Sequence, residues 1–441
     1  MKLKSKISKA PPTSLKEVRY QTSSLQSSII CLLYYFLLSA AYKLEVASKW
    51  GAAGFENDVS FIYITISIFS IFIFFYSLGN KSDFRALILI FAFLSIYVPA
   101  MVYLSLGNPH LWLGFSYFTS FFIIFWLSKI YFVTLRVKTL PKTSFVILLL
   151  AFIGFALLLL ALRAGFGNIN FGIYAVYDFR RDIAEDIGAQ LNTALSIVSK
   201  FIIPLFFIYA ISMRNNFRFL LIIIGAIYTI LIFGYWQHKS ALFLPVAVLG
   251  LYAYLRQGSA QRRLLLAFLF FSVVLGAEAI VYSIQNWTYP GAINALFGRR
   301  VFFVPPLLTD YYFEFFSNNK KIYWFGLTQH FGAVGPGYNL TPPFLIGANF
   351  FGDEERSSNV GFIGSGYANA GILGVLIYSS FLGLAVAFVS AQAKRIGVVF
   401  TFCLTAFVFH TALASSDLIT TLRSHGLLLA LVSIPFLKRV H

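Results

Sequence analysis

Two adjacent arginines, Arg299 and Arg300, stand in the segment GRRVFF, and no acidic residue lies nearer to them than Asp310. A guanidinium presents a rigid planar fork of donors and stays charged at any relevant pH, so arginines without an acidic neighbour are suited to bind phosphate oxygens. Hydrogen bonds to charged groups contribute roughly 1.5–3 kcal/mol each. The pair therefore predicts a binding site for a phosphate or diphosphate group.

Further basic residues stand in polar segments elsewhere and are candidates for the same site: Arg163, Arg180, Arg181, Lys239 and Arg356. Ordinary ion pairing is the alternative for three of them, because acidic residues flank Arg180 and Arg181 and the sequence DEE precedes Arg356. Lys239 follows His238 in the short turn WQHKS. Both residues could meet a phosphate there, or Lys239 could simply mark the end of an apolar segment.

Four side chains are candidates for accepting a proton from a hydroxyl group, which is the usual work of an imidazole or a carboxylate. They are Asp310, Glu314, His330 and His238. Asp310 and Glu314 are four residues apart in LTDYYFEFF, so a helix would place them on one face with Tyr311 nearby. The alternative is a surface helix whose polar face is solvated.

The segment SSDLITTLRSHG gathers Asp417, Arg423 and His425 beside an apolar stretch. Such a cluster is tolerated where a re-entrant turn lines a cavity, but not where it faces lipid. The acids at 353–355 could hold a divalent cation, yet contiguous acids seldom converge on one ion, so a solvated turn is preferred. No CxxC, HExxH, metal-spaced Cys/His set or GxxxxGK[ST] loop occurs in the sequence, and we expect neither a metal nor a cofactor.

Composition decides what kind of scaffold carries these residues. Of the 441 residues 59% are hydrophobic and 11% charged, against about 25% charged in a soluble protein, and the mean hydropathy is +0.79. This excludes a soluble enzyme, a disordered chain and a disulfide scaffold, and it indicates an all-α polytopic membrane protein. About twelve apolar segments are candidate transmembrane helices: 27–44, 59–78, 86–106, 113–134, 143–162, 193–212, 219–235, 241–255, 264–284, 367–390, 397–414 and 420–437.

The distribution of charge sets the expected orientation. With both termini in the cytoplasm, the inner segments and Lys129 hold 21 basic and 2 acidic residues, whereas the rest of the chain holds 13 basic and 14 acidic ones. Lysine and arginine favour the cytoplasmic ends of spans, so this arrangement accounts for the net charge of +18 without a nucleic-acid partner. It also predicts contact with anionic membrane lipids.

This topology divides the chain into regions, and it leaves two charges inside spans. A basic segment, 1–26, precedes 27–284, which holds nine spans and an outer loop at 163–192; a large outer loop at 285–366 leads to the last three spans and a short tail in 367–441. Lys200 and Glu278 fall inside spans, roughly 10–12 Å deep at 1.5 Å per residue. They could pair, face one cavity or extend to the interface.

Three motifs near the C-terminal end of the chain resemble a known family. They are GRRVFFVPPLLTDYYFEFF, SSNVGFIGSGYANAGILGVLIYSS and SSDLITTLRSHG, over about residues 297–430, and QHKSALFLP also fits. They resemble the Wzy-type polysaccharide polymerases, also called O-antigen or oligosaccharide repeat unit polymerases. The resemblance implies a GT-C-like glycosyltransferase of the bacterial inner membrane, with its site on the external face. It would transfer a glycan from one undecaprenyl diphosphate to the non-reducing end of another lipid-linked unit.

The resemblance also implies partners and residue roles. The partners would be the lipid-linked oligosaccharide, membrane lipids and a chain-length regulator protein, with no nucleotide sugar and no metal. Diphosphate binding would fall to Arg299 or Arg300 and to Lys239, with Arg163, Arg180 and Arg181 as further candidates. We add His238, Tyr311 and Arg423 to the predicted substrate contacts. The predicted catalytic residues are Arg299, Arg300, Asp310, Glu314 and His330.

Three other functions fit the same sequence. A glycan ligase shares the layout of the polymerases. A flippase or transporter of lipid-linked sugars would also have many spans, but transporters bind at the midplane between repeated halves, and no repeat is visible here. A glycosyltransferase that uses a polyprenyl-phosphate sugar could enlist Glu56 and Asp58 in the segment FENDVS.

Overall fold

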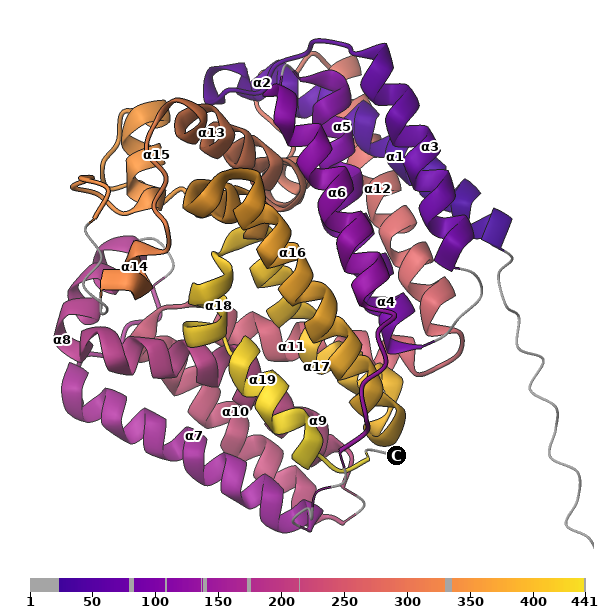
Figure 1. Ribbon diagram of the computed structural model, residues 1–441. Coiled ribbons are helices and arrows are strands. Elements are labelled where there is room, and N and C mark those ends of the chain that lie inside the picture. Colours follow the sequence, from indigo (N-terminus) through magenta and orange to yellow (C-terminus); the bar gives the residue numbers. More distant parts are fainter. Residues whose placement is uncertain are drawn as a thin grey trace, which may run out of the picture.

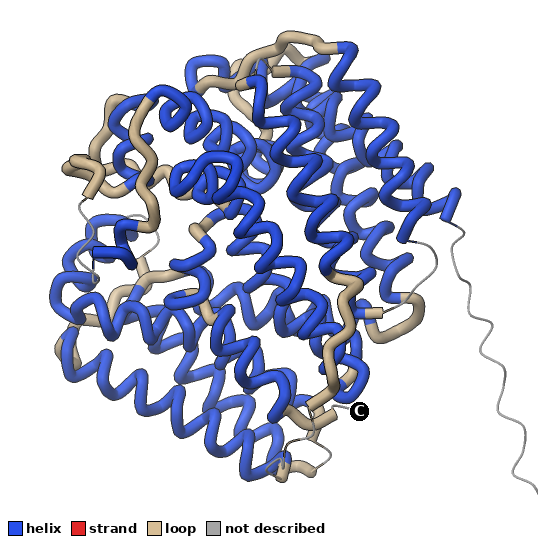
Figure 2. Tube along the Cα trace, in the orientation of Figure 1, coloured by secondary structure: helices blue, strands red, loops and turns tan. Residues whose placement is uncertain are grey.

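The computed structural model describes residues 24–78, 83–107, 109–135, 137, 141–172, 176–213, 215–329 and 335–439, without the side chains of 176–182, 184 and 185. These residues form helices joined by loops (Figure 1) and contain no strand (Figure 2). The expected all-α architecture is therefore confirmed for this part of the chain.

Nine helices in the described residues are long and apolar enough to cross a membrane. They are Ser24–Ala53, Phe61–Leu78 (α3), Phe84–Leu106, Lys142–Ala164 (α7), Asp186–Ile211, Phe217–Trp236 (α10), Ala260–Ile284 (α12), Phe362–Ile396 (α16) and Val398–Ser415. Four of these spans consist of several elements. Ser24–Ala53 comprises α1 (Ser24–Ala41), η1 (Tyr42–Ala47), α2 (Ser48–Trp50) and η2 (Gly51–Ala53), and Phe84–Leu106 comprises α4 (Phe84–Ala92), η3 (Phe93–Tyr97) and α5 (Val98–Leu106). Asp186–Ile211 comprises the second part of α8 (Val176–Ile197), η4 (Val198–Ile202) and α9 (Ile203–Ile211), and Val398–Ser415 comprises α17 (Val398–His410) and η7 (Thr411–Ser415).

Shorter apolar helices account for the remaining predicted segments. Helices α6 (Leu111–Leu127) and α11 (Lys239–Leu255) have 17 residues each. Helices α18 (Leu418–Ser424) and α19 (Leu427–Ser433), the latter extended by η8 (Ile434–Phe436), form a pair bent by 61°. The bend falls at Gly426, whose φ of 86° suits glycine. Each predicted segment thus overlaps a helix or this bent pair, although 113–134 extends past the end of α6 at Leu127. The number of crossings stays a prediction.

The core of the bundle is one fully buried helical span. Every residue in the most apolar stretch of Phe84–Leu106 is buried inside the protein, whereas the corresponding shares for α3 and α10 are 28%. The outer helices expose large apolar side chains, among them Phe69 at 65% and Phe270 at 70%. Apolar surface of this extent is stable against lipid rather than water, so the chain is an integral membrane protein.

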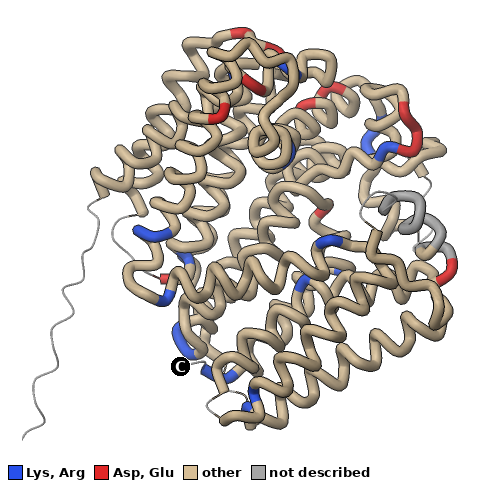
Figure 3. The backbone as a smooth tube through the Cα atoms, turned by 180° about the vertical axis from the view of Figure 1, so that it is seen from behind, with Lys and Arg blue, Asp and Glu red and all other residues tan. Residues whose placement is uncertain are grey.

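Opposite charges collect at opposite ends of the helices. Figure 3 shows Lys and Arg around the end that carries the C-terminus, and most Asp and Glu at the other end. We call the first the basic end, where Arg395 donates to the carbonyl oxygens of Ile434 and Pro435. We call the other the distal end. This separation is the pattern that the inner and outer segments of the sequence predict.

The segment 285–366, predicted as a large outer loop, contains several helices. It contains η5 (Asn294–Phe303), α13 (Val304–Asn318), α14 (Phe325–Thr328) and α15 (Pro342–Phe351). Prolines at the first turns of α13 and α15 lack the N–H that a helix start leaves unpaired. Phe313 of α13 stacks on Tyr367 of α16 with ring centroids 3.8 Å apart, which fixes these helices on the distal end.

Helix α16 is broken near its start. Ala370 and Gly371 leave helical geometry, and Gly371 has a φ of 61°. The residues before the break fold back on those after it, so a side chain at Gly374 would clash with the carbonyl oxygen of Gly366. The glycines of GSGYANAGILG thus permit a close backbone approach. The break brings residues 362–369 to the surface of the cavity described next.

Candidate functional site

A cavity of about 570 Å³ lies toward the distal end, among α8, α14, α15, the start of α16 and α18 (Figure 1). Its volume is in the range of sites for small molecules. The residues that line it are Ala189, Thr193, Tyr312, Ile322, Trp324, Gly326, Leu327, Thr341, Pro342, Pro343, Asn359, Val360, Ser365, Ala368, Asn369, Ser416, Asp417, Ile419, Thr420, Arg423 and Ser424. Asn359, Thr420 and Arg423 are exposed, so the cavity is open to its surroundings.

Asp417 fixes the helix that forms one wall of this cavity. Its Oδ2 accepts the backbone N–H groups of Ile419 at 2.9 Å and Thr420 at 3.1 Å, which caps α18. Its Oδ1 accepts the hydroxyl of Tyr378 at 2.9 Å. A carboxylate can accept about four hydrogen bonds, so lone pairs remain for a ligand in the cavity. The polar turn expected here lies at the start of the bent pair, and its re-entrant path stays a prediction.

Tyr378 connects Asp417 to an aromatic wall. The indole N–H of Trp324 donates to the Tyr378 hydroxyl at 3.0 Å. Asn369 accepts the backbone N–H of Trp324 at 2.9 Å and donates to the carbonyl of Ser365 at 2.8 Å. Sequence reasoning missed Trp324, Asn369 and Tyr378. The available signal was that Asn369 and Tyr378 are polar residues inside or beside a predicted apolar span.

Arg423 brings a positive charge to the cavity wall. It lies in the last turn of α18, and its guanidinium makes no hydrogen bond or ion pair with a described residue. Asp417 is on the same short helix but does not pair with it. A guanidinium in this position is free to bind an anionic group with its planar fork of donors. Of the predicted substrate and catalytic residues that the structure describes, Arg423 is the one that lines this cavity.

The charges inside spans have separate partners. Lys200, in η4, donates to His425 Nδ1 at 2.8 Å, and the Ser196 hydroxyl lies 3.1 Å from the same nitrogen. Glu278 instead accepts from the backbone N–H of Ile293 at 3.0 Å and of Asn294 at 2.6 Å. The expectations that Lys200 and Glu278 pair or share a cavity are therefore wrong, because each is satisfied by a different segment.

A second basic site, the distal arginine cluster, consists of Arg299, Arg300 and Arg356. The guanidinium of Arg299 lies 3.8 Å from the ring centroid of Trp50, and that of Arg356 lies 3.3 Å from the ring centroid of Phe351. Burial lowers the pKa of Arg299, and the charges of Arg300 and Arg356 lower it further. The Nε of Arg299 is buried without a hydrogen-bond partner among the described residues. Like charges held together in this way favour an anion between them.

Asp310 and Glu314 face different surroundings. Asp310 is buried, and its oxygens accept the Tyr103 hydroxyl at 2.8 Å and the backbone N–H of His110 at 2.7 Å. Burial raises the pKa of Asp310 to about 6. Glu314 is exposed. The side chains of Asp310 and Glu314 therefore do not share one face, since the first is in the interior and the second is at the surface. The hydrogen bonds of Asp310 join α13 to Tyr103 of α5 and to His110, which directly precedes α6.

Tyr311 belongs to the region of the arginine cluster. Its ring stacks on Phe350 with centroids 4.3 Å apart, and its hydroxyl lies 3.5 Å from the carbonyl oxygen of Ala53. The neighbouring residue Tyr312 points the other way, since its hydroxyl donates to Ser358 at 3.2 Å and it lines the cavity. Helix α13 thus separates the two sites.

The remaining predicted residues do not line the cavity or lie outside the described part. Lys239 is exposed at the start of α11, His238 stacks on Trp236 at 3.8 Å, and Arg163 is exposed at the end of α7. The loop that follows Arg163 packs against the end of α10, since the backbone N–H of Asn170 donates to the carbonyl oxygen of Gly234 at 2.9 Å. His330 and the side chains of Arg180 and Arg181 lie outside the described residues.

The described residues contain no group of three or more His, Cys, Asp or Glu side chains that could hold a metal ion. No family model, curated protein or solved structure matches the chain. A function must therefore be argued from the residues and their geometry.

Proposed function

We propose that this protein is a membrane glycosyltransferase that polymerises lipid-linked oligosaccharide repeat units. It would transfer a glycan from undecaprenyl diphosphate to the non-reducing end of another lipid-linked unit, at the external face of the bacterial inner membrane. The motifs that resemble the Wzy-type polymerases support this proposal. So does the position of the cavity, because all three motifs contribute to its wall: GRRVFFVPPLLTDYYFEFF through Tyr312, and SSNVGFIGSGYANAG and SSDLITTLRSHG through several residues each.

Charge asymmetry supports the orientation. The basic end carries the clusters that the positive-inside rule assigns to the cytoplasm, together with the C-terminus. The cavity and the arginine cluster then belong to the external side. A lipid-linked diphosphate would lie at the same level, because its lipid tail stays in the bilayer while its glycan projects outward.

The single observation that carries the proposal is the guanidinium of Arg423, which lies in the wall of the cavity with Asp417 and has no hydrogen-bond or ion-pair partner among the described residues. In glycan transfer, the acceptor hydroxyl oxygen bonds to the anomeric carbon while the bond to the diphosphate breaks and the diphosphate leaves with its electron pair. Arg423 would stabilise the charge that develops on that leaving group. Asp417 would accept the hydroxyl proton. Trp324 and Tyr312 would supply apolar surface against the sugar rings.

Two separate basic sites suit a polymerase, since both of its substrates are diphosphate-linked lipids. We assign Arg423 and the cavity to the reacting unit. The distal arginine cluster, with Arg299 and Arg300 as predicted, would hold the diphosphate of the second unit. The partners that the family resemblance implies, including a chain-length regulator, are part of this proposal.

The test uses purified protein in liposomes with lipid-linked repeat units as its only substrate. We expect a ladder of products, loss of the ladder in Arg423→Gln, and an unchanged ladder in Arg439→Gln, an exposed arginine at the basic end. Product formation only after another acceptor is added would indicate a ligase. Movement of the lipid-linked unit across the bilayer without a new bond would indicate a transporter.

A further inference from the structure

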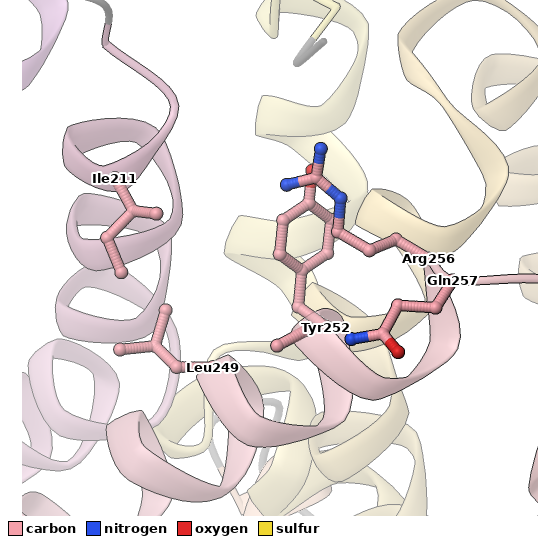
Figure 4. A pocket seen from close by; sticks show the side chains of 6 residues that line it. Ile211, Leu249, Tyr252, Arg256 and Gln257 are labelled. Carbon is pink, nitrogen blue, oxygen red and sulfur yellow. The ribbon is translucent and has the colours of Figure 1, made fainter.

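An apolar groove of about 380 Å³ lies at the basic end, far along the chain from the residues of the proposed reaction. It is lined by Ile211, Leu249, Tyr252, Ala253, Arg256 and Gln257. Figure 4 shows Ile211 from α9 and Leu249 from α11 on one side of the view, with Tyr252, Arg256 and Gln257 on the other. The groove therefore runs between the ends of two apolar helices.

The polarity of the groove changes along its length. Leu249 and Ala253 precede Arg256 and Gln257 at the end of α11, so the apolar wall is followed by polar side chains in the space of two helical turns. Val246, one turn before Leu249, is 67% exposed and extends the apolar surface toward the middle of the helix. An amphipathic ligand with one apolar and one polar end would match this order.

The polar end of the groove is positively charged. The Arg256 guanidinium lies 5.5 Å from the ring centroid of Tyr252 and makes no hydrogen bond or ion pair with a described side chain. No acidic residue occurs in the connection RQGSAQRR or in the neighbouring MRNNFR. An anionic group at this position would thus meet the charge of Arg256 without an acidic competitor from these connections.

The turn that presents Arg256 is fixed by a second arginine. Arg263 donates to the carbonyl oxygen of Tyr254 at 2.8 Å and to that of Gln257 at 3.1 Å. Its guanidinium is therefore already occupied with the end of α11, whereas that of Arg256 is not. This division of roles pre-organises one free cation at the mouth of an apolar groove.

We infer that this groove binds an anionic glycerophospholipid of the adjacent leaflet. One acyl chain would lie along Ile211, Leu249 and Ala253, and the phosphate would contact Arg256, with the Gln257 amide as a further donor. Basic residues beside transmembrane helices at the cytoplasmic surface attract anionic head groups. The inference needs no glycosyl transfer and stands whether or not the proposed function holds.

The experiment measures lipid retention by native mass spectrometry of the full-length protein, extracted from mixed vesicles of dioleoylphosphatidylglycerol and dioleoylphosphatidylcholine. We expect wild-type protein to retain phosphatidylglycerol, and Arg256→Gln to lower that retention about tenfold, the size of one hydrogen bond to a charged group. Arg262→Gln is the matched control, because Arg262 is an exposed arginine of the same connection and outside the groove.

A second variant tests the apolar part. Ala253→Trp fills the groove at an exposed position, and we expect it to reduce retention of both lipids while helical content by circular dichroism is unchanged. Equal losses in Arg256→Gln and Arg262→Gln would overturn the inference in favour of diffuse charge attraction. Unchanged lipid retention in Ala253→Trp would also overturn it. So would a wild-type protein that has a dimer mass and an Ala253→Trp variant that has a monomer mass, because the groove would then be an interface between copies.

Discussion

The cavity and the distal arginine cluster both present positive charge at the distal end, but they are built in different ways. Among the described residues, the cavity has one guanidinium, that of Arg423, which makes no hydrogen bond or ion pair. It also has a carboxylate held by three hydrogen bonds and an aromatic wall. In the cluster, the guanidinium groups of Arg299 and Arg356 lie over the rings of Trp50 and Phe351, and neither residue lines the cavity. The cavity thus offers space for a substrate beside a single cation, whereas the cluster gathers several cations against aromatic rings.

From this difference we expect the cavity to stabilise the transition state and the arginine cluster to bind the substrate in its ground state. A group that meets developing charge inside a cavity should affect turnover, whereas cations that hold a diphosphate equally in both states should affect apparent affinity. The proposed polymerase needs both kinds of site. Variants in the two regions are therefore expected to divide into kcat and KM effects.

The largest effect is expected from Asp417→Asn. Asparagine can still cap α18 with its amide oxygen, and its amide N–H can donate to the Tyr378 hydroxyl that Asp417 accepts, so the helix is expected to keep its position. It cannot take a proton from the acceptor hydroxyl, and we expect turnover of lipid-linked repeats to fall by about 10²–10⁴-fold. The control is Glu314→Gln, at an exposed carboxylate that does not line the cavity. Turnover near the wild-type value in Asp417→Asn would show that Asp417 is not the proton acceptor.

The second effect tests the arginine cluster. We expect Arg299→Gln to raise the KM for the lipid-linked substrate about tenfold or more, with a smaller change in kcat, since a hydrogen bond to a charged group contributes roughly 1.5–3 kcal/mol. Arg300→Gln should act in the same direction. A fall in kcat without a change in KM would place the cluster at the reacting atoms and reverse the assignment of the two regions.

The sequence predicted the spans and part of the site, but not how distant segments meet. The helical segments follow from apolar runs, and the polar turn with Asp417 and Arg423 follows from composition against an apolar neighbour. Trp324 and Tyr378 were missed because their contact depends on the break at Gly371, which periodicity does not reveal. Arg356 joins Arg299 only through the fold of the segment between them.

Other predictions failed for the same reason. Asp310 and Glu314 have the spacing of one helical face, yet a hydrogen bond from His110 and one from Tyr103 bury the first and leave the second exposed. The spacing of two residues in the sequence determines whether their side chains project from the same side of a helix. Contacts with other segments determine whether each side chain is buried or faces solvent.

A smaller effect on turnover is expected from Tyr378→Phe. The substitution keeps the ring but removes the donor to Asp417 and the acceptor for the Trp324 indole. The lost hydrogen bond is to a carboxylate, and a hydrogen bond to a charged group contributes roughly 1.5–3 kcal/mol, so we expect kcat to fall about tenfold or more. Because Tyr378 acts through Asp417, the double variant Tyr378→Phe, Asp417→Asn should lose little beyond Asp417→Asn alone. Fully additive losses would show that the two residues act independently.

The smallest effect on turnover, and a clear effect on stability, is expected from Asp310→Asn. The pKa of this buried carboxyl is raised to about 6 in the folded protein, above its value of 3.8 in an unfolded chain. A raised pKa means that the protonated acid favours the folded state, so this contribution is complete below pH about 4 and is lost as the pH rises through about 6. The difference corresponds to roughly 3 kcal/mol. Thermal unfolding in detergent from pH 5 to 8 should therefore show wild-type stability falling relative to Asp310→Asn, with Glu314→Gln following the wild type. Parallel curves for the wild type and Asp310→Asn would instead mean that this carboxyl is ionised throughout and that α13 is not held by a buried acid, which would weaken the separation of the cavity from the arginine cluster.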